Sequence, residues 1–224
     1  MKNPPAKLWR QFVASLIVIG AALFGAAGTL DYWQAWLFLV VVAVSCVPVT
    51  LLMAGNAKLT ENRARYGTRA EKRSIQKIIV LCLEVAATAT YLVPALDRRF
   101  GWSNLPLWLS MAGDLLILAG MWMVYCVFKA NSFGSATIEI ADDQRVISTG
   151  PYAIVRHPMY AGASVYLAGA SLALGSYWGL IPAILTTLCF VWRLFDEEGF
   201  LAQNLPGYRE YCAGVRWRLI PGVF

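Results

Sequence analysis

The stretches GPYAIVRHPMYAG at residues 150–162 and RLFDEE at residues 193–198 decide the fold. The first contains His157, the only histidine of the chain, and the second closes the last long apolar segment. In a membrane protein, charged side chains are costly to desolvate and mark candidate functional sites. The fold therefore depends on whether the apolar segment between the two stretches brings them together.

That intervening segment is predicted to form a tight helical hairpin. Pro158 suits the first turn of a helix, and a proline pushes the residue before it towards extended geometry. A helix over residues 158–174 would rise about 25 Å, and after a turn at 175–179 a second helix over 177–195 would descend a similar distance. Because the two helices have similar lengths, Glu197 and Glu198 are expected at the same depth in the membrane as Arg156 and His157. The small residues Gly169 and Ala173 predict a face for close packing against the descending helix.

Composition indicates a polytopic membrane protein. Hydrophobic residues make up 58% of the 224 residues and charged residues 14%, and the mean hydropathy is +0.56. Apolar stretches at roughly 11–28, 33–54, 78–96, 105–128, 158–174 and 177–195 approach the about 20 residues that cross a bilayer, and the last two are the shortest. We predict an all-α fold, a transmembrane helix bundle of about six spans. It would form one domain over residues 1–224, in which 1–76 form an N-terminal helical hairpin and basic loop and 77–224 form the core.

The basic residues predict the orientation of this bundle. Residues 55–77 carry seven lysines and arginines and the N-terminus adds three, whereas the loops on the opposite side hold only Arg98 and Arg99. The positive-inside rule then places both termini, the 55–77 loop and both polar stretches in the cytoplasm. This placement explains the net charge of +6 without a nucleic-acid partner. A prokaryotic inner membrane is the expected location, or the endoplasmic reticulum in a eukaryote.

Other candidate sites are weaker. The five cysteines have no metal-ligand spacing, so we predict neither a disulfide framework nor a metal site. Glu84 and Asp114 fall inside predicted spans. An intramembrane carboxylate is either functional or held neutral within the bundle, and the sequence leaves both interpretations open.

Together these motifs resemble the isoprenylcysteine carboxyl methyltransferase family, integral-membrane enzymes that use S-adenosylmethionine. The resemblance covers roughly residues 115–224 and rests on GPY at 150–152, RHPxYxG at 156–162, RxxxEE at 193–198 and the tail from Tyr208 to Gly222. The RHPxY element alone is also similar to a motif of membrane sterol reductases, which bind NADPH. Those reductases usually have Asn at the position of Met159 and Glu at that of Ala163, and these departures favour the methyltransferase.

The resemblance implies a cytoplasmic-face pocket for S-adenosylmethionine between residues 144–162 and the end of the hairpin. Val146 and Ile147 would offer backbone contacts to adenine, His157 and Tyr160 would contact the ribose or methionine part, and Glu198 the hydroxyls or amino group. The implied cofactor-binding residues are Val146, Ile147, Gly150, Tyr152, His157, Tyr160 and Glu198. The implied catalytic residues are Arg193, Glu197 and Arg156.

The expected reaction moves the methyl group to a lipophilic acceptor, with a carboxylate such as that of isoprenylcysteine favoured. A carboxylate needs no general base, and Arg193 or Arg156 could orient it bidentately. An amine acceptor needs a base, and His157 is the only histidine available. Three alternatives stay open: phospholipid amine N-methylation, an NADPH-dependent reductase, and a non-catalytic lipid-binding bundle.

Overall fold

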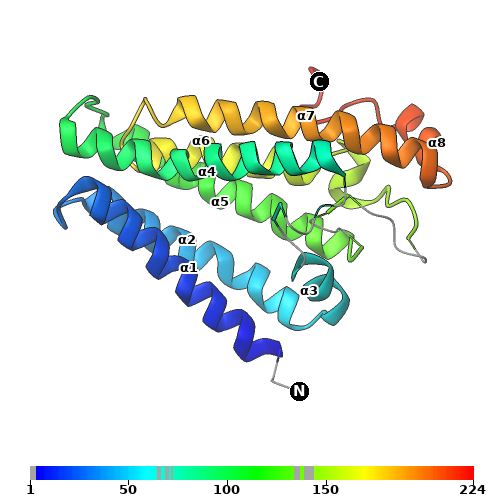
Figure 1. Cartoon of the computed structure of the whole chain (residues 1–224), viewed down its shortest axis with the longest axis horizontal. Helices are drawn as coiled ribbons and strands as arrows, with labels where there is room; N and C mark the ends of the chain where they lie inside the picture. The colour runs from blue at the N-terminus through cyan, green and yellow to red at the C-terminus, as the bar shows by residue number, and fades with distance from the viewer. Residues whose placement is uncertain (1–3, 65–66, 69–70, 72, 134–136, 139–143) are drawn as a thin grey trace.

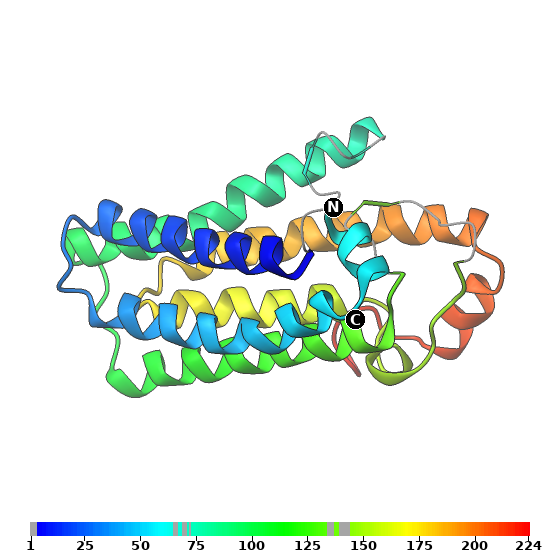
Figure 2. The same cartoon turned by 90° about the horizontal axis from the view of Figure 1, so that it is seen from below.

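The computed structural model describes residues 4–64, 67–68, 71, 73–133, 137–138 and 144–224, and its regular structure in these ranges is entirely helical. The prediction of an all-α bundle is confirmed. Six helices lie side by side in an elongated bundle: α1 (Pro4–Ala27), α2 (Trp33–Ala54), α4 (Ser74–Phe100), α5 (Leu107–Ala130), α6 (Pro158–Ala173) and α7 (Leu180–Asn204) (Figure 1). The short elements α3 (Ala57–Ala64), η1 (Gly150–Ala153) and α8 (Tyr208–Gly214) gather at one end, the site end. Figure 2 shows that α4 is inclined to the other long helices.

Four helices of the described chain are long and apolar enough to cross a membrane, namely α1 from Ala6 onwards, α2, α4 and α5. The prediction of about six spans is therefore supported for four of them. Helix α6 has only 16 residues, a length of about 24 Å at 1.5 Å per residue, short of a hydrocarbon core of about 30 Å. Helix α7 has 25 residues, but Arg193, Asp196, Glu197 and Glu198 crowd its site end.

The predicted helical hairpin is confirmed as α6 and α7. Helix α6 begins at Pro158 in the first helical turn, and His157 before it has φ −123° and ψ 61°, outside the helical range. The chain then reverses at Gly175, whose φ of +77° is unfavourable for a residue with a Cβ atom. The two helices run antiparallel and return the chain to the site end (Figure 1).

The small residues of α6 pack against α5, so the predicted packing of Gly169 and Ala173 against the descending helix is wrong. A Cβ atom on Gly113 of α5 would lie 2.3 Å from the backbone nitrogen of Ala173, and one on Gly120 would lie 2.6 Å from the carbonyl oxygen of Gly162. The two backbones are therefore in direct contact along this α5–α6 seam. The spacing of small residues identifies a close-packing face, but it does not identify which helix that face meets.

A buried polar cluster holds the opposite end of the bundle together. Asp97, which is 2% exposed, accepts hydrogen bonds from the backbone N–H and the hydroxyl of Ser103 and from the hydroxyl of Ser176. The hydroxyl of Tyr32 donates to the carbonyl oxygen of Leu174 at 2.6 Å. These contacts fix the α1–α2, α4–α5 and α6–α7 turns together, so the lengths of α6 and α7 decide where their other ends meet.

The structure does not assign a function to Asp114 or Glu84, the two carboxylates within predicted spans. Asp114 is buried in α5, and its Oδ1 atom has no hydrogen-bond partner among the described residues. Glu84 is half-buried on α4, and its Oε1 atom would lie 3.5 Å from a Cβ on Gly67. Both interpretations of these residues stay open.

The α5–α6 seam predicts a strong effect of one added methyl group. Gly113→Ala should lower the free energy of unfolding by about 1–3 kcal/mol, because the new Cβ overlaps backbone atoms that cannot move independently. Gly25→Ala on α1 is the matched control, since its Cβ would meet nothing within 4 Å. That variant should be neutral or slightly more stable. Equal thermal unfolding midpoints for the two variants in detergent micelles would contradict the seam.

Candidate active site

A cavity of about 450 Å³ lies at the site end, between α4, α6, α7 and the segment leading into η1. Its polar part is lined by Arg63, Tyr152, Arg156, His157, Tyr160, Arg193 and Glu197. Its apolar part continues between the helices and is lined by Val80, Leu83, Ala87, Ala163, Tyr166, Leu167 and Phe190. One cavity thus joins a charged chamber to a hydrophobic passage.

Glu198 joins the two predicted polar stretches at the edge of this cavity. Its Oε1 atom lies 3.2 Å from His157 Nε2 and 3.2 Å from Arg156 Nη1, and its Oε2 atom accepts a hydrogen bond from Arg218 Nε at 3.0 Å. Burial by itself would raise the pKa of Glu198, but the hydrogen bond with His157 and the charges of Arg156 and Arg218 outweigh it and keep that pKa below its ordinary value. The predicted convergence of the two stretches is confirmed.

The C-terminal tail holds this Glu198 cluster (Glu198, Arg156, His157 and Arg218) in place through the backbone. The N–H groups of Arg156 and His157 donate to the carbonyl oxygens of Trp217 and Arg218, each at 2.9 Å. Closer to α7, the hydroxyl of Tyr211 on α8 donates to the carbonyl oxygen of Tyr152 at 2.8 Å. The tail is therefore a structural part of the site.

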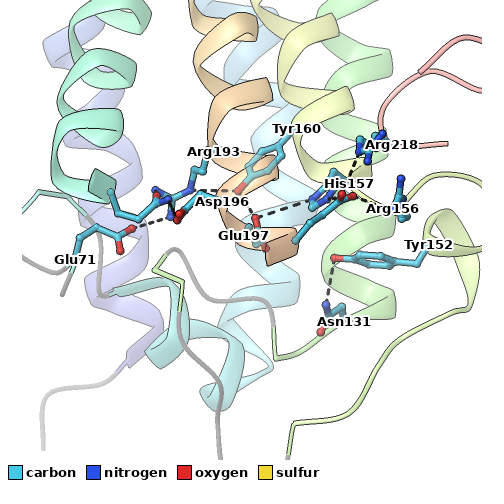
Figure 3. A network of polar contacts seen from close by, with 12 residues as sticks. Glu71, Asn131, Tyr152, Arg156, His157, Tyr160, Arg193, Asp196, Glu197 and Arg218 are labelled. Atoms are coloured by element: carbon cyan, nitrogen blue, oxygen red, sulfur yellow. Dashed lines mark hydrogen bonds and ion pairs between the residues drawn. The ribbon is translucent and has the colours of Figure 1, made fainter. Parts of the chain in front are cut away.

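Tyr160 links the remaining two charged residues of the motifs. Its hydroxyl donates to Glu197 Oε2 at 2.7 Å and accepts from Arg193 Nε at 3.2 Å. Burial and then the charge of Glu197 raise the pKa of Tyr160 well above its ordinary value, so the phenol keeps the proton that it donates. Glu197 lies between Tyr160 and His157, with its Oε2 atom 4.0 Å from His157 Nδ1 (Figure 3).

Arg193 is deeply buried and already paired. It is 5% exposed, and its Nη2 atom lies 2.7 Å from Glu71 Oε1, while Nη1 donates to Gln76 Oε1 at 2.9 Å. Burial works against the charge, but Tyr160 and the Glu71 carboxylate more than compensate and raise the pKa of Arg193. Arg193 therefore joins α7 to the start of α4 and holds the Tyr160 hydroxyl.

Most residues implied by the resemblance meet at the cavity. Those that line it are Val146, Ile147, Tyr152, Arg156, His157, Tyr160, Arg193 and Glu197. Gly150 and Glu198 are not among the described lining residues: Gly150 starts η1 with a φ of +60°, and Glu198 lies behind Arg156 and His157. Glu71 and Arg63 are not predicted as site residues, because they lie in the basic 55–77 region, where no motif distinguishes them from their neighbours.

Residues 108–206 match the family model of phospholipid methyltransferases. This part of the chain is similar to that family. It falls in the same group of integral-membrane methyltransferases as the isoprenylcysteine enzymes, which confirms the resemblance. The matched residues run from α5 to the end of α7 and include the α5–α6 seam, the 150–162 stretch and the Glu197–Glu198 pair. No curated protein matches the chain significantly.

The buried Glu71–Arg193 pair predicts a large loss of stability when one partner is removed. Glu71→Ala leaves Arg193 charged, buried and without its carboxylate, which should cost about 3–5 kcal/mol. Arg73→Ala is the matched control, because Arg73 is 41% exposed in its pair with Asp196 and such surface pairs contribute about 0–1 kcal/mol. Thermal unfolding in detergent measures both, and a Glu71→Ala protein as stable as Arg73→Ala would refute the role of Glu71.

The lowered pKa of Glu198 predicts a pH dependence of stability. The stabilisation from this carboxylate is complete above the unfolded pKa of about 4.3 and is lost as the pH falls through the lower, folded pKa. The stability advantage of the wild-type protein over Glu198→Gln should therefore persist at about pH 5 and above and shrink below about pH 4. Unfolding of both proteins across this range checks it, and an advantage that grows with acid would show the opposite sign.

Proposed function

We propose that this protein transfers a methyl group from S-adenosylmethionine to a lipophilic acceptor at the cytoplasmic face of a membrane. The single observation that carries the proposal is the cavity that joins the Tyr160–Glu197–His157 chamber to an apolar passage between α4, α6 and α7. The family match to residues 108–206 supports methyl transfer. The basic residues at the site end support the cytoplasmic orientation.

The polar chamber suits a cationic nucleotide cofactor. The carboxylate of Glu197 lies on the cavity wall and would attract the sulfonium or amino group of S-adenosylmethionine. Residues 144–148 form no helix or strand, so the backbone groups of Val146 and Ile147 are available for hydrogen bonds to an adenine edge. His157 and Tyr160 would contact the ribose or methionine part. Glu198 would act from behind, by holding Arg156 and His157 in position.

The apolar passage suits the hydrocarbon part of the acceptor. Val80, Leu83 and Ala87 on α4 face Ala163 and Phe190 across it, and α4 is one of the helices able to cross a membrane. A lipid tail in this passage would keep the acceptor's head group in the polar chamber. The activity would thus be limited to acceptors with an apolar chain long enough to fill the passage.

The bound cofactor would supply an electrophilic methyl group on a positively charged sulfur. A lone pair of the acceptor would form the new bond to that carbon, and the electrons of the broken S–C bond would stay with the sulfur. The chain's residues would mainly position the two reactants and exclude water. A carboxylate acceptor has no proton to lose, and we favour it for that reason.

Phospholipid amine methylation is the second candidate, and the family match favours it. A protonated amine has to lose its proton before it can attack. His157 would take up that proton, and its Nδ1 atom lies 4.0 Å from Glu197 Oε2. The two candidates differ in their products. Alkali releases the label of a methyl ester but not that of an N-methyl group, so radiolabelled methyl transfer to total membrane lipids distinguishes them.

Cofactor binding is the first test of the proposed function. The purified protein should bind S-adenosylmethionine and S-adenosylhomocysteine with micromolar affinity in calorimetry. Glu197→Gln should weaken S-adenosylmethionine about tenfold and the neutral-sulfur product less, because the lost charge faces the sulfonium. Glu61→Gln on α3, outside the described cavity lining, is the control. No measurable binding of either compound by the wild-type protein would reject the proposal.

A further inference from the structure

Arg63 is a cation in the cavity that the family motifs do not include. It lies on α3, which is anchored by the fully buried Leu59 packed among Val49, Val127 and Phe128. The guanidinium carbon of Arg63 lies 4.7 Å from the centroid of the Phe128 ring. Arg63 is also one of the residues that line the cavity. Helix α3 thus holds one positive charge at the chamber from outside the matched region of the chain.

The charge of Arg63 has no ionic partner among the residues that the structure describes. Its Nε atom is buried without a hydrogen bond, and the guanidinium forms no ion pair with any described carboxylate. Three other arginines at the site are paired, Arg193 with Glu71 and both Arg156 and Arg218 with Glu198, and Arg145, which also lines the cavity, is exposed to solvent. Burial lowers the pKa of Arg63, and the charge of Glu197 only partly opposes this. Arg63 is partly buried, and a charge removed from water without an ionic partner is costly unless a ligand completes it.

The net charge of the cavity lining also favours an anionic ligand. The ionised groups on its described lining are Arg63, Arg145, Arg156, Arg193 and Glu197. Glu198 compensates Arg156, and Glu71 compensates Arg193, both from behind the wall. That leaves two arginines and one glutamate facing the chamber. Because S-adenosylmethionine carries a net positive charge, a second ligand with an anionic group would balance the filled chamber.

We propose that Arg63 binds an anionic oxygen group, a carboxylate or a phosphate, of a ligand held in this cavity. The inference rests on the proposed function and deepens it. Arg193 and Arg156, the arginines that the motifs suggest for this task, are already occupied by Glu71 and Glu198. The anion has two possible sources, which are the acceptor's own acid group and the α-carboxylate of the cofactor. Arg63 provides planar N–H donors suited to either.

The experiment uses the full-length protein in detergent and direct binding as its readout. The variants are Arg63→Gln, Arg63→Lys and, as matched control, Lys58→Ala. Lys58 is an exposed cation on the same helix, 4.2 Å from the Phe133 ring, and it does not line the described cavity. Circular dichroism confirms that each variant is folded before binding is measured.

Two pairs of probes distinguish the sources of the anion. S-adenosylhomocysteine is compared with its decarboxylated analogue, and N-acetyl-S-farnesylcysteine is compared with its carboxamide. Arg63→Gln should weaken one carboxylate-bearing probe about tenfold or more and leave its neutral counterpart unchanged. Arg63→Lys should recover part of that loss, and Lys58→Ala should change nothing. The pair that responds identifies whether the anion belongs to the cofactor or to the acceptor.

Equal effects on the charged and the neutral member of both pairs, or effects no larger than those of Lys58→Ala, would overturn the assignment of Arg63. Failure of the proposed function looks different, because the wild-type protein would then bind neither S-adenosylhomocysteine nor its analogue. In that case the farnesyl pair still decides the inference. If the wild-type protein binds the farnesyl carboxylate more tightly than its carboxamide and Arg63→Gln abolishes this difference, the assignment of Arg63 is supported. If the wild-type protein binds the two farnesyl probes equally, the assignment is overturned.

Discussion

The architecture of the site depends on the partly buried carboxylate of Glu198. It lies at the end of α7 and meets Arg156 and His157 from the start of α6 and Arg218 from the tail. These segments come together only because α6 and α7 return to the same level and the far end is fixed by Asp97 and Tyr32. A change in the relative length of the two helices would separate the Glu198 cluster and open the wall of the cavity.

The charges at the site fall into two groups with different tasks. The buried pair of Arg193 with Glu71 and the partly buried pair of Arg156 with Glu198 join the starts of α4 and α6 to α7. These pairs stabilise the wall and place Tyr160 and His157. Glu197, Arg63 and Arg145 instead line the chamber, one negative and two positive. A chamber with opposite charges and an apolar passage suits the two proposed ligands, a cationic nucleotide and an amphipathic acceptor.

The local motifs predict the site better than the packing around it. Pro158, the lengths of the two apolar legs and the RxxxEE stretch are sufficient to predict that Glu198 meets His157. The partner of the Gly169 face could not be predicted, because glycines at matching spacing occur on α5 as well. Glu71 and Arg63 could not be predicted either. Their contacts depend on how α3 and the start of α4 fold over the bundle, and no local pattern encodes that long-range arrangement.

Photoaffinity labelling tests the central claim most directly, namely that the chamber beside the Glu198 cluster holds the nucleotide. The probe is S-adenosylmethionine with an azide on adenine, and the labelled peptides are identified by mass spectrometry with and without excess S-adenosylhomocysteine. We expect competable label on peptides from residues 144–160 or 195–211, which line the part of the cavity proposed to hold adenine. Competable label confined to peptides from the opposite end of the bundle, or label that S-adenosylhomocysteine does not displace, would contradict it.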